Sequence, residues 1–153
     1  DELQRPEGDW PPADFRGKGG EYAGFARPHT ERTEEFDRII RDRRIVPEAA
    51  PRGDDRVVAN GEALHRLLRR RGVLFLFYMG FAANMCVPFR DYGMRAMKDR
   101  GYEVVLLEDC TTAIEVEDTA DDLLLSQACK IDAALTIGYT LQSADLLTAC
   151  SEV

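Results

Sequence analysis

From Arg56 onward the chain alternates short apolar runs with segments of helical periodicity. The run Val73 to Met79 is apolar at every position and ends at Gly80, which predicts a strand covered on both faces at the centre of a sheet. In chain order we expect a weak strand at Val57 and Val58, a helix between Asn60 and Gly72, the strand Val73 to Met79, a helix from about Cys86 to Arg100, a strand from Glu103 to Leu107, a helix from about Thr119 to Ile131, a strand from Ala133 to Ile137 and a helix from Ser143 to Cys150. Right-handed crossovers between such elements predict an α/β fold, a three-layer α/β/α arrangement around a mainly parallel sheet.

The first third of the chain has a different character. Six of its seven prolines and a cluster of glycines lie within the first 51 residues, which is typical of loops. Thr30 to Arg43 is the exception, because Thr30 or Thr33 can cap a helix there and acidic residues crowd its start. We therefore divide the chain into residues 1–55, a loop-rich arm with one helix, and residues 56–153, the βα core. The stretch Trp10 to Phe25 suits a lid, an interface segment or a plain surface loop.

Composition and charge narrow the class of protein. The chain has 153 residues, of which 44% are hydrophobic and 31% charged, values that fit one globular domain. Its net charge of −8 repels phosphate backbones, so we expect no nucleic acid partner. No apolar run approaches the roughly 20 residues that cross a bilayer, so we expect no membrane partner. The chain starts at Asp1 without an apolar leader, and we interpret it as processed or as a fragment.

The cysteines are widely separated, without a CxxC pair, and the chain has only two histidines. This pattern argues against a zinc site, and the sequence indicates no other metal or cofactor. The four cysteines, each in or beside an apolar segment, are Cys86, Cys110, Cys129 and Cys150. Two disulfides are one reading of them, but the apolar settings favour buried free thiols, a reducing compartment and a cytoplasmic location.

The segment from Gly80 to Cys86 is the best candidate for chemistry. It leaves the most apolar predicted strand, passes through small residues and sets Cys86 at the first turn of a helix. Ligands of open parallel sheets bind beyond the carboxyl ends of the strands, where this loop lies. The unpaired N–H groups and positive dipole end of a helix start favour a thiolate and could hold an oxyanion. A merely packed cysteine is the alternative at this point.

Residues 61–113 resemble the isochorismatase-like cysteine hydrolases, a family that includes nicotinamidases and N-carbamoyl amidohydrolases. The resemblance rests on three elements in the same order: Gly61-x-x-Leu64-x-x-x-Leu68-x-x-x-Gly72-Val73, then Gly80-x-x-x-Asn84-x-Cys86-Val87, then Gly101-Tyr102-x-Val104 leading to Asp109. It covers about a third of the chain closely, and a weaker βα continuation extends it to Cys150. The Asn-x-Cys-Val element after a glycine is its most specific part.

The resemblance implies a fold, a reaction and a set of site residues. It implies a sheet between helices and a nucleophilic cysteine at Cys86, which hydrolyses an amide or related bond of a small-molecule substrate through an acyl-enzyme. The backbone N–H groups of Ala82 and Cys86 would form the oxyanion hole, aided by a cis peptide between Phe81 and Ala82. We add Phe81, Asn84, Arg90 and Tyr139 as candidate substrate-binding residues. For isochorismatases proper, which cleave a vinyl ether, the cysteine is dispensable.

Two departures from the family pattern qualify this function. The family's general-base aspartate ends its first strand, and no apolar run followed by Asp stands in the first part of this sequence. The family's lysine is also missing, because Val57 and Val58 lead directly into Ala59. The first strand is thus apparently absent from this chain. The chain is then either an N-terminally incomplete hydrolase or a catalytically degenerate member that binds a small molecule or has a structural role.

Other residues allow functional and structural interpretations. Asp109 could bind a ligand but suits a turn cap, and Arg90 with Asp91 could recognise a substrate carboxylate or form a surface pair. His65 is expected to be solvated on its helix, and nothing indicates a role for His29. A thiol redox sensor at Cys86 would need a resolving cysteine nearby, and the sequence has none adjacent. Because few strands cover the predicted sheet, we expect a homo-oligomer or an upstream segment to complete it.

Overall fold

The computed structural model describes residues 10–42 and 44–152. The chain divides into two compact units, Asp1–Arg52 and Gly53–Val153. The helices and strands of both are α1 (Ala13–Gly17), η2 (Gly20–Phe25), α2 (Glu31–Asp42), η3 (Pro47–Ala49), α3 (Gly61–Arg71), β1 (Phe75–Phe81), α4 (Cys86–Phe89), α5 (Met94–Asp99), β2 (Glu103–Thr112), α6 (Glu117–Ala120), α7 (Leu124–Asp132), η4 (Ala133–Ile137), β3 (Tyr139–Leu141) and α8 (Ser143–Ser151).

The first unit contains short helical turns and one longer helix. The segment expected to be a lid, interface or loop carries α1 and the 3-10 turn η2, and Phe15 contacts Tyr22 edge to face with ring centroids 5.3 Å apart. Helix α2 begins within one residue of the predicted start. Thr30 caps it as expected, because the Thr33 N–H donates to Thr30 Oγ1 over 3.3 Å. His29 lies 3.7 Å from Glu34 at the same helix start.

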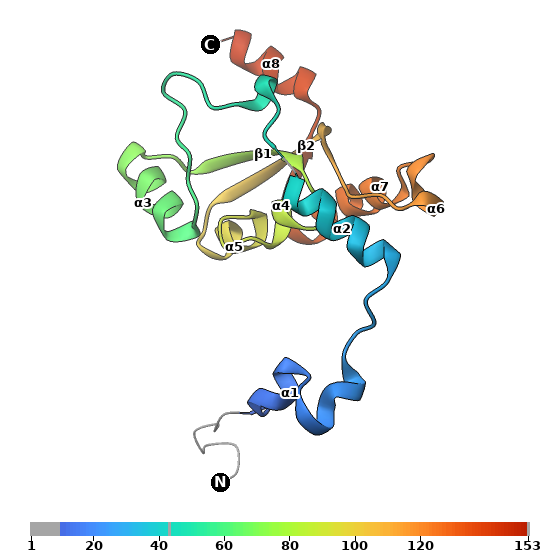
Figure 1. Ribbon diagram of the computed structural model, residues 1–153. Helices are drawn as coiled ribbons and strands as arrows, with labels where there is room; N and C mark the ends of the chain where they lie inside the picture. Colours follow the sequence, from blue (N-terminus) through green and yellow to red (C-terminus); the bar gives the residue numbers. More distant parts are fainter. Residues whose placement is uncertain (1–9, 43, 153) are drawn as a thin grey trace. The chain divides into compact units, whose positions relative to one another are not determined.

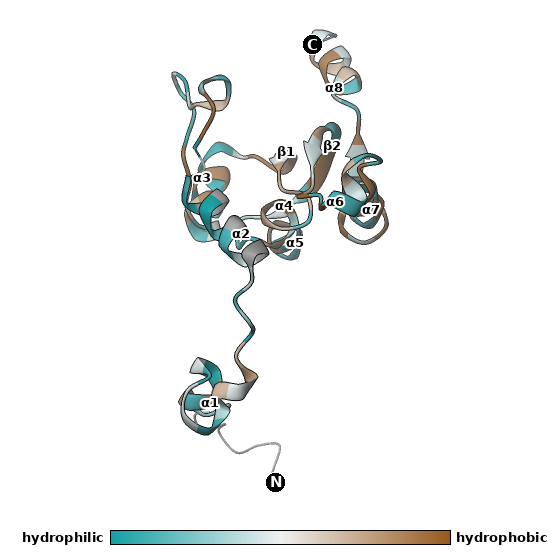
Figure 2. Ribbon diagram, turned by 45° about the vertical axis from the view of Figure 1, so that its right-hand side comes forward, coloured by the Kyte–Doolittle hydropathy of each residue, from teal (hydrophilic) through white to brown (hydrophobic). Residues whose placement is uncertain are grey.

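The second unit is an α/β fold built on a parallel sheet in the order β1-β2-β3. Helices lie on both sides of this sheet, with α8 on the side opposite to α5 (Figures 1 and 2). The core lies on the α5 side and combines buried residues of β2 with Leu68, Met94 and Met97. The α/β class with a parallel sheet, predicted from the alternating pattern, is confirmed.

Strand β2, not the run at Val73 to Met79, is the sheet's centre. The expected central strand begins later, as β1, and forms one edge of the sheet. Its side chains alternate between half-buried and exposed, and Phe77 and Met79 are 46% and 66% exposed. Apolar composition did not distinguish a central strand from an edge strand, because burial depends on how many strands and helices lie beside a strand. Val57 and Val58, expected to form a weak strand, lie outside all strands, and Val57 is 81% exposed.

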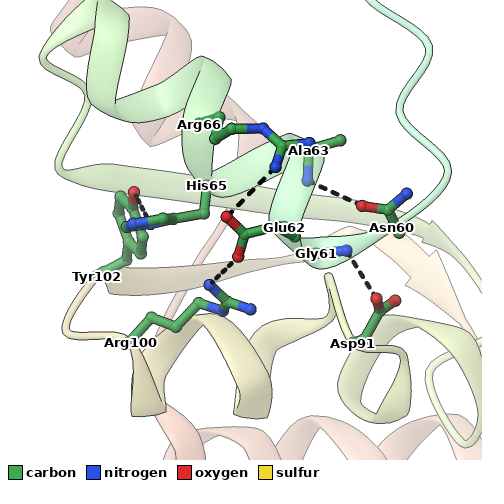
Figure 3. Close-up of polar contacts among 9 residues, drawn as sticks. All are labelled: Asn60, Gly61, Glu62, Ala63, His65, Arg66, Asp91, Arg100 and Tyr102. Atoms are coloured by element: carbon green, nitrogen blue, oxygen red, sulfur yellow. Dashed lines mark hydrogen bonds and ion pairs between the residues drawn. The ribbon is translucent and has the colours of Figure 1, made fainter.

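Helix α3 shows how local sequence and distant partners fix one element together. Asn60 caps the helix as predicted, because Ala63 N–H donates to Asn60 Oδ1 over 2.8 Å. The Gly61 N–H donates to Asp91 Oδ2 over 2.7 Å, and a Cβ at Gly61 would lie 2.0 Å from the Asp91 carbonyl oxygen. His65 is half-buried and hydrogen-bonds the Tyr102 hydroxyl over 2.8 Å, which corrects its expected solvated position (Figure 3). Helix α3 is thereby joined to the segment that follows α4.

Two predicted helices are each divided in two. The helix expected from Cys86 to Arg100 ends at Phe89 and resumes at Met94. Between them the chain turns so that Asp91 reaches the start of α3, and Gly93 approaches the Val87 carbonyl too closely for a Cβ. The helix expected from Thr119 to Ile131 is divided into α6 and α7, with Leu123 in a left-handed conformation between them.

The predicted strand Ala133 to Ile137 is wrong. These residues extend α7 as a π-helical turn, and the short strand β3 follows at Tyr139–Leu141, opposite Val105 to Leu107 of β2. A short apolar run has the same composition in a strand and in a buried helical turn, so its periodicity did not decide between them. The helix predicted from Ser143 to Cys150 is confirmed as α8.

Candidate active site

The loop between β1 and α4 holds the candidate nucleophile. The peptide between Phe81 and Ala82 is cis, as the family resemblance implies. Ala82 and Ala83 are 2% and 6% exposed, so the loop is anchored in the interior before it reaches Cys86. The Ala83 N–H donates to the Thr112 carbonyl over 2.8 Å, and the Ala82 carbonyl accepts from the Met85 N–H at 3.0 Å. The loop is therefore tied to the end of β2 and turned back on itself.

Asn84 connects this loop to the segment after β2. Its Nδ2 donates to the Ile114 carbonyl over 3.1 Å, and its Oδ1 accepts from the Ile114 N–H over 3.0 Å. Both polar ends of the side chain are thus engaged with one backbone residue. The sequence suggested substrate binding for Asn84; the geometry favours a positioning role for its amide.

An open hollow of about 430 Å³ lies over the start of α4. It is lined by Asn84, Met85, Cys86, Phe89 and Arg90. The Cys86 side chain is half-buried, and Phe89 is 64% exposed. Sequence reasoning identified Asn84, Cys86 and Arg90 but missed Met85 and Phe89. Phe89 lies three residues after Cys86, a helical spacing that places two side chains on one face and could have revealed it.

The guanidinium of Arg90 lies beside the Cys86 side chain. Its pKa is raised, first by a side-chain hydrogen bond with Cys86 and then by the charge of that group. The neighbouring carboxylate of Asp91 accepts instead from the Gly61 N–H. Of the two interpretations left open for this pair, the structure thus shows Asp91 in a helix cap and Arg90 at the hollow.

The backbone N–H groups of Ala82 and Cys86 lie at the two ends of the loop between β1 and α4. Outside the strand ladder and the helices, no backbone carbonyl of the described residues accepts a hydrogen bond from either group. Cys86 is the first residue of α4, so its N–H precedes the first hydrogen bond inside the helix. These are the two donors that the family resemblance implies for an oxyanion hole.

The remaining candidates lie elsewhere. Phe81 ends β1 and is 65% exposed, whereas Tyr139 starts β3, pairs with Val105 and is 63% exposed. Neither is among the residues that line the hollow. Asp109 caps α8, since the Ser143 N–H and hydroxyl donate to its carboxylate over 2.8 and 2.5 Å and lower its pKa.

A second polar network lies after β2, where sequence reasoning found nothing. Glu115 accepts from the Leu125 N–H at 3.1 Å and from the Ser126 N–H at 2.8 Å, at the start of α7. Burial alone would raise the pKa of this carboxyl, but its hydrogen bonds outweigh burial and lower the pKa to about 2. The Ser126 hydroxyl, which is fully buried, donates to Glu115 and accepts from the Ala113 N–H. Glu115 is ten residues before Leu125, outside any local capping spacing.

The four cysteines are free thiols, as expected, but they are not all buried. Cys86 and Cys129 are half-buried, and Cys110 and Cys150 are exposed. Among the residues described, His, Cys, Asp and Glu form no group of three or more placed to hold a metal ion. No helix in the described ranges is long and apolar enough to cross a membrane.

Comparisons with known proteins place this fold and loop in a family. Residues 20–130 match the model of the isochorismatase domain. A crystal structure of a cysteine hydrolase from Pseudomonas syringae pv. phaseolicola 1448A is similar, with a TM-score of 0.59 and 20% sequence identity. The match covers 80% of this chain but 65% of that one, so the chain spans about two thirds of the length of its structural relative. No curated protein gave a significant match. Because the isochorismatase model covers residues 20–130, more than half of the sequence, the chain belongs to the isochorismatase domain family.

Proposed function

We propose that this chain is a cysteine hydrolase that cleaves an amide-like C–N bond of a small molecule through an acyl-enzyme at Cys86. The observation that carries the proposal is the position of Cys86, which lies in an open hollow at the start of α4 beside the Arg90 guanidinium. A partly exposed, electropositive setting of this kind is typical of catalytic cysteines. Membership in the isochorismatase domain family supports the same reaction class.

The reaction follows from the groups around the sulfur. The Cys86 thiolate attacks the substrate's carbonyl carbon, forming an S–C bond while the carbonyl electron pair moves to oxygen. The backbone N–H groups of Ala82 and Cys86 donate to that oxyanion. When the intermediate collapses, the C–N bond breaks and the amine leaves with the proton that the Cys86 thiol lost when it formed the thiolate. Water then hydrolyses the thioester, which releases the acid and restores the thiol.

This chemistry also needs a general acid–base group for the amine and the water. The five residues that line the hollow include no carboxylate and no histidine. That observation favours a second candidate function, a family member that binds a small molecule in the hollow without turning it over. The two candidates differ in one measurable quantity, the turnover of amide substrates.

The test measures the hydrolysis of nicotinamide, N-carbamoyl amino acids, ureido acids and isochorismate by the parent chain, Cys86→Ala and Cys86→Ser. We expect turnover of an amide by the parent and a loss of at least about 10³-fold in both variants, because the nucleophile is removed. Intact mass should show an acylated parent, with the added group on Cys86. Cys110→Ala is the matched control, since Cys110 lies in β2 outside the hollow, and its activity should equal that of the parent.

Two results would contradict the proposal. Turnover that survives Cys86→Ala would show that the sulfur forms no essential covalent intermediate, as in the vinyl-ether cleavage of isochorismatases proper. If the parent binds panel members without hydrolysing any of them, the binding function replaces the hydrolase.

A further inference from the structure

Arg90 lines the hollow, and among the described residues it forms no ion pair with a carboxylate. It is exposed, it follows Cys86 by one helical turn, and its backbone N–H donates to the Cys86 carbonyl over 3.3 Å. A guanidinium without a carboxylate partner is unusual in a chain of net charge −8, in which acidic side chains outnumber basic ones.

The carboxylate next to Arg90 in the sequence is engaged elsewhere. The Asp91 carboxylate accepts from Gly61 at the start of α3. Arg95 provides the contrast: its guanidinium lies 5.6 Å from the Phe89 ring centroid and is paired with Asp132 Oδ2 at 2.7 Å. Arg95 thus has a carboxylate partner, whereas Arg90, which lines the hollow with the nucleophile, has none among the described residues.

We propose that Arg90 binds a carboxylate group of the substrate, so that the molecule attacked at Cys86 carries both an amide and a free carboxylate. A guanidinium presents two parallel N–H donors that match a carboxylate, and such charge-assisted pairs give orientation as well as affinity. Met85 and Phe89 supply apolar wall for a short carbon chain between the carboxylate and the amide. The volume of about 430 Å³ is within the range of small-molecule pockets. This inference deepens the proposed function and rests on it for the reaction, but not for the binding.

A competing account gives Arg90 a single role, the stabilisation of the Cys86 thiolate. The two accounts differ in what they predict for charged and neutral reagents of the same size. Iodoacetate and iodoacetamide both alkylate a thiolate: the sulfur forms a bond to the iodinated carbon, the C–I bond breaks and iodide leaves. They differ in whether the rest of the molecule is a carboxylate or an amide, so thiolate stabilisation affects both rates equally.

The experiment measures the rate of each reagent at Cys86 and at Cys110 by peptide mass spectrometry. Cys110 is an exposed thiol on β2 and serves as the internal reference. We expect the iodoacetate-to-iodoacetamide ratio to be higher at Cys86 than at Cys110. Arg90→Gln should lower the ratio at Cys86 by about tenfold, the value of one charge-assisted hydrogen bond, and Arg90→Lys should restore part of it. Arg71→Gln, which removes the same charge from the last turn of α3, should leave the ratio unchanged.

A second measurement uses reversible protection. Succinate should slow the alkylation of Cys86 by iodoacetamide in the parent and not in Arg90→Gln, whereas succinamide should protect neither. If Arg90→Gln slows both reagents equally, or if succinate and succinamide protect alike, carboxylate recognition by Arg90 is wrong. Alkylation requires no turnover, so these results stand whether or not the chain hydrolyses amides. Hydrolysis of neutral amides through Cys86 with an unchanged reagent ratio would refute this inference and leave the proposed function intact.

Discussion

Two loops follow the carboxyl ends of neighbouring strands, and they differ in how far their polar groups are hydrogen-bonded within the protein. The β1 loop, residues 82–85, and the β2 loop, residues 113–116, follow neighbouring parallel strands. In the β2 loop, Glu115 engages the start of α7, and Ser126 satisfies the Ala113 N–H. At the end of the β1 loop the Cys86 N–H has no backbone acceptor among the described residues outside the strand ladder and the helices, and Arg90 has no ion-pair partner there. The polar groups of the β2 loop form hydrogen bonds within the fold, whereas those at the end of the β1 loop are available to a ligand.

Asn84 is the point at which the two loops meet. Its amide exchanges two hydrogen bonds with the backbone of Ile114. The closed network of the β2 loop therefore supports the open one, because Ile114 lies next to Glu115 and is held with it. We infer that a rigid neighbour allows the β1 loop to keep unpaired groups in fixed positions, as preorganised binding sites require.

The largest expected effect comes from cutting that connection. Asn84→Ala removes the partners of both Ile114 backbone groups, and we expect the free energy of unfolding to fall by about 2 kcal/mol. Because the β1 loop loses its anchor, the rate of Cys86 alkylation should change as well, while that of Cys110 should not. Urea unfolding and peptide mass spectrometry measure the two effects.

Asn60→Ala is the matched control for this change. It removes the cap of α3, which also costs about 1 kcal/mol, but Asn60 contacts the start of α3 and does not line the hollow. Its variant should lose stability without any change at Cys86. Similar Cys86 alkylation in the parent and in Asn84→Ala would mean that Ile114 does not position the nucleophile loop.

The contrast between the loops also separates what the sequence predicted from what it did not. Helix α3 was predicted closely because Asn60 and Gly72 mark its ends locally. The position of Cys86 at a helix start was predicted because Gly80 and the small residues after it signal a turn after an apolar strand. The features that the sequence predicted correctly are those that a few neighbouring residues determine.

Features that depend on distant partners were missed. Glu115 caps a helix ten residues away, and Asp91 accepts from Gly61 across 30 positions. The bulge between Tyr78 and Gly80, where β2 carries extra residues against β1, depends on strand pairing, and so does the edge position of β1. Periodicity reports which residues are apolar but not which strands become neighbours.

The second prediction concerns the β2 loop alone. Ser126 is fully buried, and its hydroxyl both donates to Glu115 and accepts from the buried Ala113 N–H at 2.8 Å. Ser126→Ala should lower the free energy of unfolding by about 1.5 kcal/mol, because a buried donor loses its partner. The measurement is urea unfolding at neutral pH.

Ser143→Ala offers the same substitution at the surface, where the hydroxyl donates to exposed Asp109. We expect a loss below about 0.5 kcal/mol there. Equal losses in the two serine variants would show that burial does not distinguish these contacts, and the closed character of the β2 loop would then be in doubt.

The smallest expected effect is a dependence on pH that belongs to the β2 loop. The folded-state pKa of Glu115 is about 2, below its ordinary value of 4.5. A carboxyl with a lowered pKa contributes stability that is complete above its unfolded pKa and is lost as the pH falls through its folded pKa. The Tm difference between the parent and Glu115→Gln should therefore be constant from neutral pH down to about 4.5 and should shrink toward zero near pH 2. Glu117→Gln, an exposed acid in the first turn of α6, should show little difference at any pH. A Tm difference for Glu115→Gln that persists undiminished at pH 2 would mean that the substituted amide side chain does not fit in place of the carboxylate. The charge of Glu115 would then not be what holds the start of α7.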